Sequence, residues 1–197
     1  MITQFSRYRS RSILPSIHPG LVSGTTYGFF EELSGTFRPT LQASGVLTAG
    51  RVYYYPFRCG QTITPSSVYL EITTAVAASN MRLGIYANSN GVPAGSPLWD
   101  SGDVATATTG NKTASISNVT LVAGNWYWLA VHNSAAIAFQ SFNGGTHAGI
   151  GFSSAGSATL YGCWIETKSY GALAAPGTLA FSATPTSGLP PRAQFLI

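Results

Sequence analysis

The chain has little charge. Only 8% of its 197 residues are charged, about a third of the share in an average soluble domain, whereas 45% are apolar. A disordered chain would show the opposite balance, so this composition excludes that class. The 22 glycines and 11 prolines, together with many Ser and Thr residues, indicate an all-β protein solvated by hydroxyls and amides. Its length suffices for one sizeable core but not for two ordinary domains.

Long apolar runs are also missing. No stretch approaches the roughly 20 residues that a membrane helix requires. The first 20 residues, MITQFSRYRSRSILPSIHPG, carry basic side chains but lack the apolar centre and cleavage site of a signal peptide. We therefore expect a protein that is made in the cytoplasm and has no membrane partner.

Few residues are of the kinds that carry chemistry. The only cysteines, Cys59 and Cys163, match no zinc or redox spacing, which leaves two buried thiols or one disulfide as alternatives. The three histidines, which include His132, stand in no metal-ligand pattern, and no nucleophile elbow or phosphate-binding loop occurs. We predict no enzyme, no cofactor and no metal. A glycosidase-like carboxylate pair among the six acids is the weaker alternative.

The positive charge is concentrated at the N-terminus. Arg7, Arg9 and Arg11 lie in a segment without acids, whereas seven Lys and Arg residues balance six acids over the rest of the chain. A nucleic-acid reader would present a dense basic face, so we expect no nucleic-acid partner. The three arginines are either a solvated terminus or a tether that docks on an acidic groove of a partner protein.

Alternating residues predict β-strands in the body of the chain. In residues 66–75 Val68, Leu70 and Ile72 share one face, and residues 82–87 repeat the pattern, as expected of half-buried antiparallel strands. The run WYWLAV (126–131) is apolar on both faces, which predicts a central strand. Glu71 and Arg82 fall on the polar faces of consecutive strands, and we expect them to pair across those strands.

The segment ANSNGVPAGSPLWDSG (87–102) is first of all a corner. Asn90-Gly91 supplies the positive φ angles of a tight turn. Pro93 and Pro97 predict that pairing does not resume before Leu98. A calcium site at the two nearby aspartates is the weaker alternative, since this cation requires six to eight oxygens.

About eight short strands separated by turn clusters predict an all-β fold, an antiparallel β-sandwich of jelly-roll-like type with an extended N-terminal arm. We place the arm at 1–40 and the sandwich domain at 41–197. A Gly- and Ser-rich loop at 143–157 interrupts the strands.

Several of these segments also carry a resemblance. YYYPF, RLGIYANSNGVPAGSPLW, LVAGNWYWLAV and the closing LPPRAQFLI resemble a module found in virion proteins of tailed bacteriophages and prophages. The resemblance spans about 46–133 and the last ten residues, and the chain departs from it at 134–188. It implies a β-sandwich on the particle exterior and carries over no catalytic residue.

From the resemblance we expect a virion protein, made in the host cytoplasm, whose partners are capsid or tail proteins and other copies of itself. It is either a head decoration or fibre protein anchored by its arm, or an adhesin that binds a host surface glycan. A cellular carbohydrate-binding module is an outside alternative. The candidate glycan platform consists of Tyr86, Trp99, Tyr161 and Trp164, whose alternative role is packing in the core.

Overall fold

The structure is a computed structural model that describes residues 26–28, 41–142, 151–152, 160–161, 163–181 and 191–197. These residues form fifteen strands and no helix. The predicted anchoring residues Arg7, Arg9 and Arg11 lie outside the described residues, as does most of the 143–157 loop.

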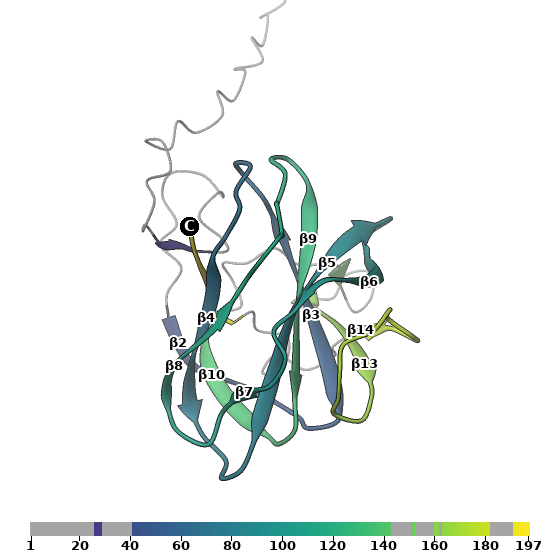
Figure 1. The fold of residues 1–197 in the computed structure, drawn as a ribbon. Coiled ribbons are helices and arrows are strands. Elements are labelled where there is room, and N and C mark those ends of the chain that lie inside the picture. Colours follow the sequence, from purple (N-terminus) through teal and green to yellow (C-terminus); the bar gives the residue numbers. More distant parts are fainter. Residues whose placement is uncertain (1–25, 29–40, 143–150, 153–159, 162, 182–190) are drawn as a thin grey trace, which may run out of the picture.

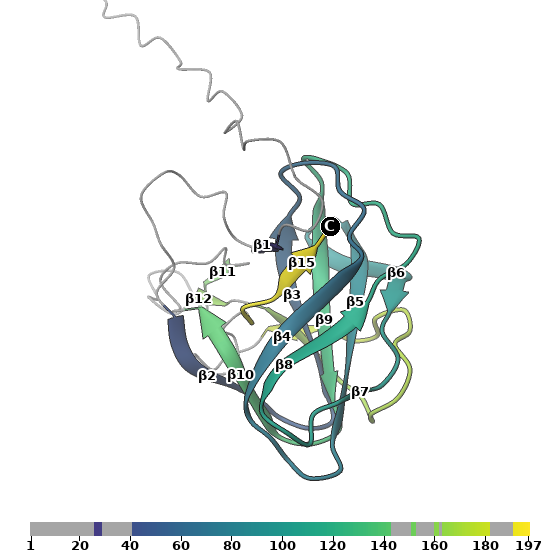
Figure 2. The same cartoon turned by 60° about the vertical axis from the view of Figure 1, so that its left-hand side comes forward.

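Two curled antiparallel sheets face one another (Figure 1), and Figure 2 shows the first sheet in front of the second. The first sheet contains β1 (Thr26–Gly28), β2 (Leu41–Leu47), β4 (Ser67–Thr74), β8 (Gly110–Ser115), β10 (Ile137–Phe142) and β15 (Gln194–Leu196). The second contains β3 (Arg51–Arg58), β5 (Asn80–Ser89), β6 (Val92–Asp100), β7 (Val104–Ala105), β9 (Trp126–Asn133), β13 (Trp164–Thr167) and β14 (Ala180–Phe181). A separate hairpin pairs β11 (Gly151–Phe152) with β12 (Leu160–Tyr161).

This arrangement confirms the predicted all-β sandwich. The strand count exceeds eight because six of the fifteen strands are only two or three residues long. One of these, β1, lies within the segment predicted as an arm, and it pairs with β15 near the C-terminus.

The chain passes repeatedly from one sheet to the other, and this overturns one predicted contact. Strand β4 belongs to the first sheet and β5 to the second, so Glu71 and Arg82 are not cross-strand neighbours. Glu71 instead pairs with Arg192, at 2.6 Å between Oε2 and Nη2. The prediction was wrong because consecutive antiparallel strands need not belong to the same sheet.

The space between the sheets holds the main core. Val68, Leu70 and Ile72 of β4 point into it, as their alternation predicts, and so do Leu83 and Ile85 of β5. At about 25 cal/mol per Å² of apolar surface, each fully buried side chain of this size contributes about 1.5–3 kcal/mol.

Strand β9 is central, as its two apolar faces predict, because it pairs with β3 on one side and β5 on the other. Tyr127, Leu129 and Val131 enter the main core, whereas Trp128 and Ala130 face outward into a second apolar cluster. The second sheet is therefore covered on both sides.

The β5–β6 hairpin confirms the predicted corner. Asn90 has a φ of 52° and Gly91 a φ of 83°, the left-handed pair of a two-residue hairpin loop. Pairing resumes at Val92, immediately after the loop, so the prediction that the prolines delay it to Leu98 was wrong. Strand β6 is an edge strand, where a proline can sit with its missing N–H facing away from the partner.

Candidate functional site

The outer face of the second sheet carries the densest group of polar and aromatic side chains that have specific partners. Residues 168–179, which we call the strap, connect β13 to β14 and cover this face. The apolar cluster beneath the strap consists of Val52, Tyr54, Tyr86, Trp128, Ala130 and Leu173, with Trp164 and Leu179 at its margin.

Two buried tyrosines fix the strap from below. The Tyr54 hydroxyl donates to Glu166 Oε2 at 2.8 Å, and the other oxygen of this carboxylate accepts the Gly177 N–H at 3.1 Å. The Tyr86 hydroxyl donates to the Ala174 carbonyl at 2.8 Å. Burial, followed by the Glu166 carboxylate, raises the pKa of Tyr54, so its hydroxyl keeps the proton it donates. These phenols are structural donors.

A charged group fixes the strap at its other end. Arg82 contacts Asp100 at 2.9 Å and Asp103 at 2.8 Å. The same Asp100 oxygen accepts the Leu173 N–H at 3.0 Å, and Asp103 accepts the Tyr170 hydroxyl at 2.8 Å. The Tyr170 hydroxyl, and then Arg82, lower the pKa of Asp103. The guanidinium thus bridges the two aspartates that the calcium alternative would need as ligands.

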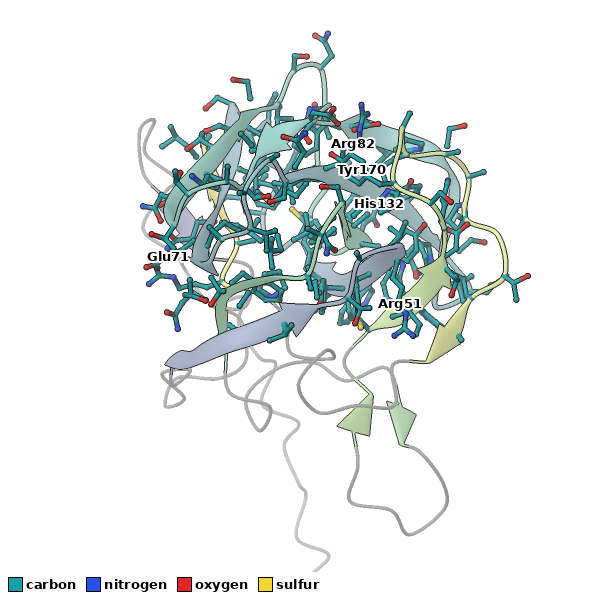
Figure 3. All side chains as sticks on the ribbon, turned by 90° about the horizontal axis from the view of Figure 1, so that it is seen from below. Arg51, Glu71, Arg82, His132 and Tyr170 are labelled. Atoms are coloured by element: carbon teal, nitrogen blue, oxygen red, sulfur yellow. The ribbon has the colours of Figure 1, made fainter. Side chains whose placement is uncertain are left out.

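His132 lies under the strap, beside Arg82 and Tyr170 (Figure 3). It is fully buried, with its ring centroid 5.0 Å from that of Tyr170 and Nε2 3.3 Å from the Lys168 carbonyl oxygen. Its Nδ1 is buried with no hydrogen-bond partner in the described part of the chain. Burial lowers the pKa of His132, since the charged form would lose its hydration.

We expect His132 to make folding stability depend on pH. The unfolded chain binds a proton near pH 6.5, whereas the folded chain binds it at a lower pH. Stability should therefore be full above about pH 6.5 and fall as the pH drops toward the folded pKa. Urea unfolding from pH 7.5 to 5 should show this slope, and the His132→Gln variant should have a smaller one. An unchanged slope in that variant would remove His132 from the explanation.

Two of the four residues of the predicted glycan platform, Tyr86 and Trp99, are buried. Tyr86 is fully buried under the strap, and Trp99 lies in the main core with its Nε1 donating to the Ser115 carbonyl at 3.1 Å. Trp164 is half-buried and packs against the apolar cluster beneath the strap, and its indole N–H donates to the Gly91 carbonyl at 3.1 Å. Tyr161 is described only in its backbone, in β12. Sugar stacking requires an exposed ring face, so we withdraw Tyr86 and Trp99.

Both cysteines are thiols buried in the same core, and the Cys59 thiol donates to the Gln61 carbonyl at 2.8 Å, so of the two alternatives the structure has the buried thiols. Sequence reasoning missed the strap, because the strands that hold it are far away along the chain: Tyr86 is 88 residues from Ala174, and Tyr54 is 112 residues from Glu166. It also missed the exposure of Trp126, which is 44% exposed although its strand is buried from Tyr127 onward. Its place as the first residue after a Gly-Asn turn was the available signal.

The described residues offer no other chemical centre. They contain no group of three or more His, Cys, Asp or Glu side chains that could hold a metal ion. Within the same part of the chain, no helix is long and apolar enough to cross a membrane. No family model, curated protein or solved structure matches this chain.

Proposed function

We propose that this chain is a non-enzymatic structural protein displayed on the surface of a phage virion, as a head decoration or a fibre component. The observation that carries the proposal is that each carboxylate side chain among the described residues is engaged within the fold. Glu71 binds Arg192, Asp100 and Asp103 share Arg82, and Glu166 accepts from Tyr54 and Gly177. A carboxyl group that acts as a general acid or base must reach the substrate, whereas these four are held by partners within the fold.

The packing and the low charge of the chain also fit a module that is displayed on the surface of a particle. The strap and the main core give a body that is packed on both sides of one sheet, and the low charge suits a surface that contacts neighbouring proteins. The resemblance of residues 46–133 to a phage virion module supports the same location. Strands β6 and β14 end the second sheet, and such edges can pair with other copies.

The anchor of the proposed protein is its N-terminal arm, with Arg7, Arg9 and Arg11 bound to carboxylates or carbonyls of a capsid or tail protein. Deleting residues 1–20 retains β1, so we expect unchanged melting and at least about a tenfold loss of affinity for particles that lack the protein. Co-sedimentation measures the binding. The matched control replaces the three arginines by lysines, which keep the charge. Full binding by the deletion variant would contradict the anchor.

A host-glycan adhesin is the second candidate, and the exposed Trp126 is the observation that favours it. Imaging virions with a gold-labelled antibody separates a head decoration, which labels the whole head, from a fibre component or an adhesin, which labels the tail or a few vertices. An adhesin added as soluble protein should also block adsorption to the host. Virions that carry no label at either place would overturn both forms of the proposal.

A further inference from the structure

One surface of the sandwich presents an aromatic ring that the fold does not use. Trp126 is the largest of the exposed hydrophobic side chains in the described part of the chain, at 44% exposure, and Val122 beside it in sequence is 46% exposed. Val122 belongs to the turn that leads into β9, and Trp126 is the first residue of that strand. The strap covers the outer face of the second sheet at Trp128 and Ala130 of β9. It does not cover the end of β9 at which Trp126 lies.

The turn that precedes Trp126 is held in place by hydrogen bonds from its backbone N–H groups. The N–H groups of residues 122–124 donate, in order, to the Tyr127 hydroxyl, the Thr62 hydroxyl and the Cys59 carbonyl, at 2.7–3.0 Å. A turn with its backbone donors satisfied holds its backbone, and hence the direction of each Cα–Cβ bond, in place before a ligand arrives. Binding to such a surface loses little conformational entropy.

A cation stands next to the ring. Arg58 on β3 is directly opposite Trp126 on β9, and residues directly opposite in an antiparallel pair project from the same face. Arg58 is exposed, and its Nε donates to the Gly124 carbonyl at 3.3 Å, which fixes the guanidinium beside the turn. The carboxylate side chains among the described residues bind elsewhere, so none of them neutralises Arg58.

We propose that Trp126 and Arg58 form a binding site for an acidic monosaccharide unit of a surface polysaccharide. The apolar C–H face of the sugar ring stacks on the indole, and the Arg58 Nη groups bind the carboxylate of the sugar. One ring and one guanidinium match a single uronic acid residue. A nucleic acid strand would require a row of cations along its phosphates, and the charge of the chain is nearly balanced beyond Arg11.

This inference rests on the adhesin form of the proposed function. The test titrates the full-length protein with trigalacturonate and follows tryptophan fluorescence and calorimetric heat. We expect saturable binding that weakens at least about tenfold in Trp126→Ala, in Arg58→Gln and toward the fully methyl-esterified trisaccharide. Leu98→Ala is the matched control, because Leu98 is also 46% exposed but lies on β6. Melting curves establish that each variant is folded.

The site would be overturned by the absence of binding to trigalacturonate and to every acidic oligosaccharide on an array, or by binding that Trp126→Ala leaves intact. Binding of a single-stranded oligonucleotide with the same dependence on Trp126 and higher affinity would also overturn the sugar assignment. If soluble Trp126→Ala protein blocks adsorption as well as the unmodified protein, this site fails and the adhesin function stands. If virions carry no label, the proposed function fails whatever the saccharide result.

Discussion

Replacing Leu173 by alanine should lower the free energy of unfolding by about 3 kcal/mol. Leu173 is the strap residue that seals the outer apolar cluster, and it is only 7% exposed. Its removal leaves a cavity above Tyr54, Tyr86 and Trp128, which the strap cannot fill because hydrogen bonds hold it on both sides. Urea unfolding followed by tryptophan fluorescence measures the loss. A loss below about 1 kcal/mol would mean that the strap contributes little to the fold.

Gly84 permits the close approach of this leucine. A Cβ at position 84 would lie 2.3 Å from Leu173 Cδ1 and 3.2 Å from the Trp99 carbonyl oxygen, so Gly84→Ala should cost about 2 kcal/mol. In the double variant, Leu173→Ala removes the Cδ1 atom. We therefore expect the two losses to fall short of additivity by at least about 1 kcal/mol. The control is Gly171→Ala, whose added Cβ meets no atom within 4 Å. Strict additivity would contradict the contact.

Replacing Glu166 by alanine should lower the free energy of unfolding by about 3 kcal/mol, because it leaves two donors without an acceptor. These donors are the hydroxyl of the fully buried Tyr54 and the backbone N–H of Gly177. Glu166→Gln should cost only about 1 kcal/mol, since its amide oxygen can accept from Gly177 while the Tyr54 hydroxyl reverses and accepts from the amide. Chemical unfolding at pH 7 distinguishes the two variants.

The matched control for Glu166→Ala is Glu71→Ala on the opposite sheet. The Glu71–Arg192 pair is 35% and 28% exposed at its two side chains, so we expect its loss to cost less than about 1 kcal/mol. Equal losses for Glu71→Ala and Glu166→Ala would contradict the view that burial under the strap makes the Glu166 contacts important.

Much of the fold could be predicted because the relevant signals are local. The alternation of Val68, Leu70 and Ile72 determines which face of β4 is buried, since successive side chains point to opposite faces. Asn90-Gly91 determines a tight hairpin because both residues tolerate positive φ. The two apolar faces of residues 126–131 predict a central strand. The candidate site could not be read in this way, because its contacts join residues far apart in the sequence.

The sequence by itself determined that this protein is an all-β sandwich and where its main strands and turns lie. The tertiary structure alone decided which sheet each strand joins, and hence that Glu71 pairs with Arg192 and Arg82 with the two aspartates. It alone decided that Tyr86 is covered by the strap while Trp126 is exposed. The physical reason is that an apolar pattern indicates that a face will be covered, whereas the packing of distant segments determines what covers it.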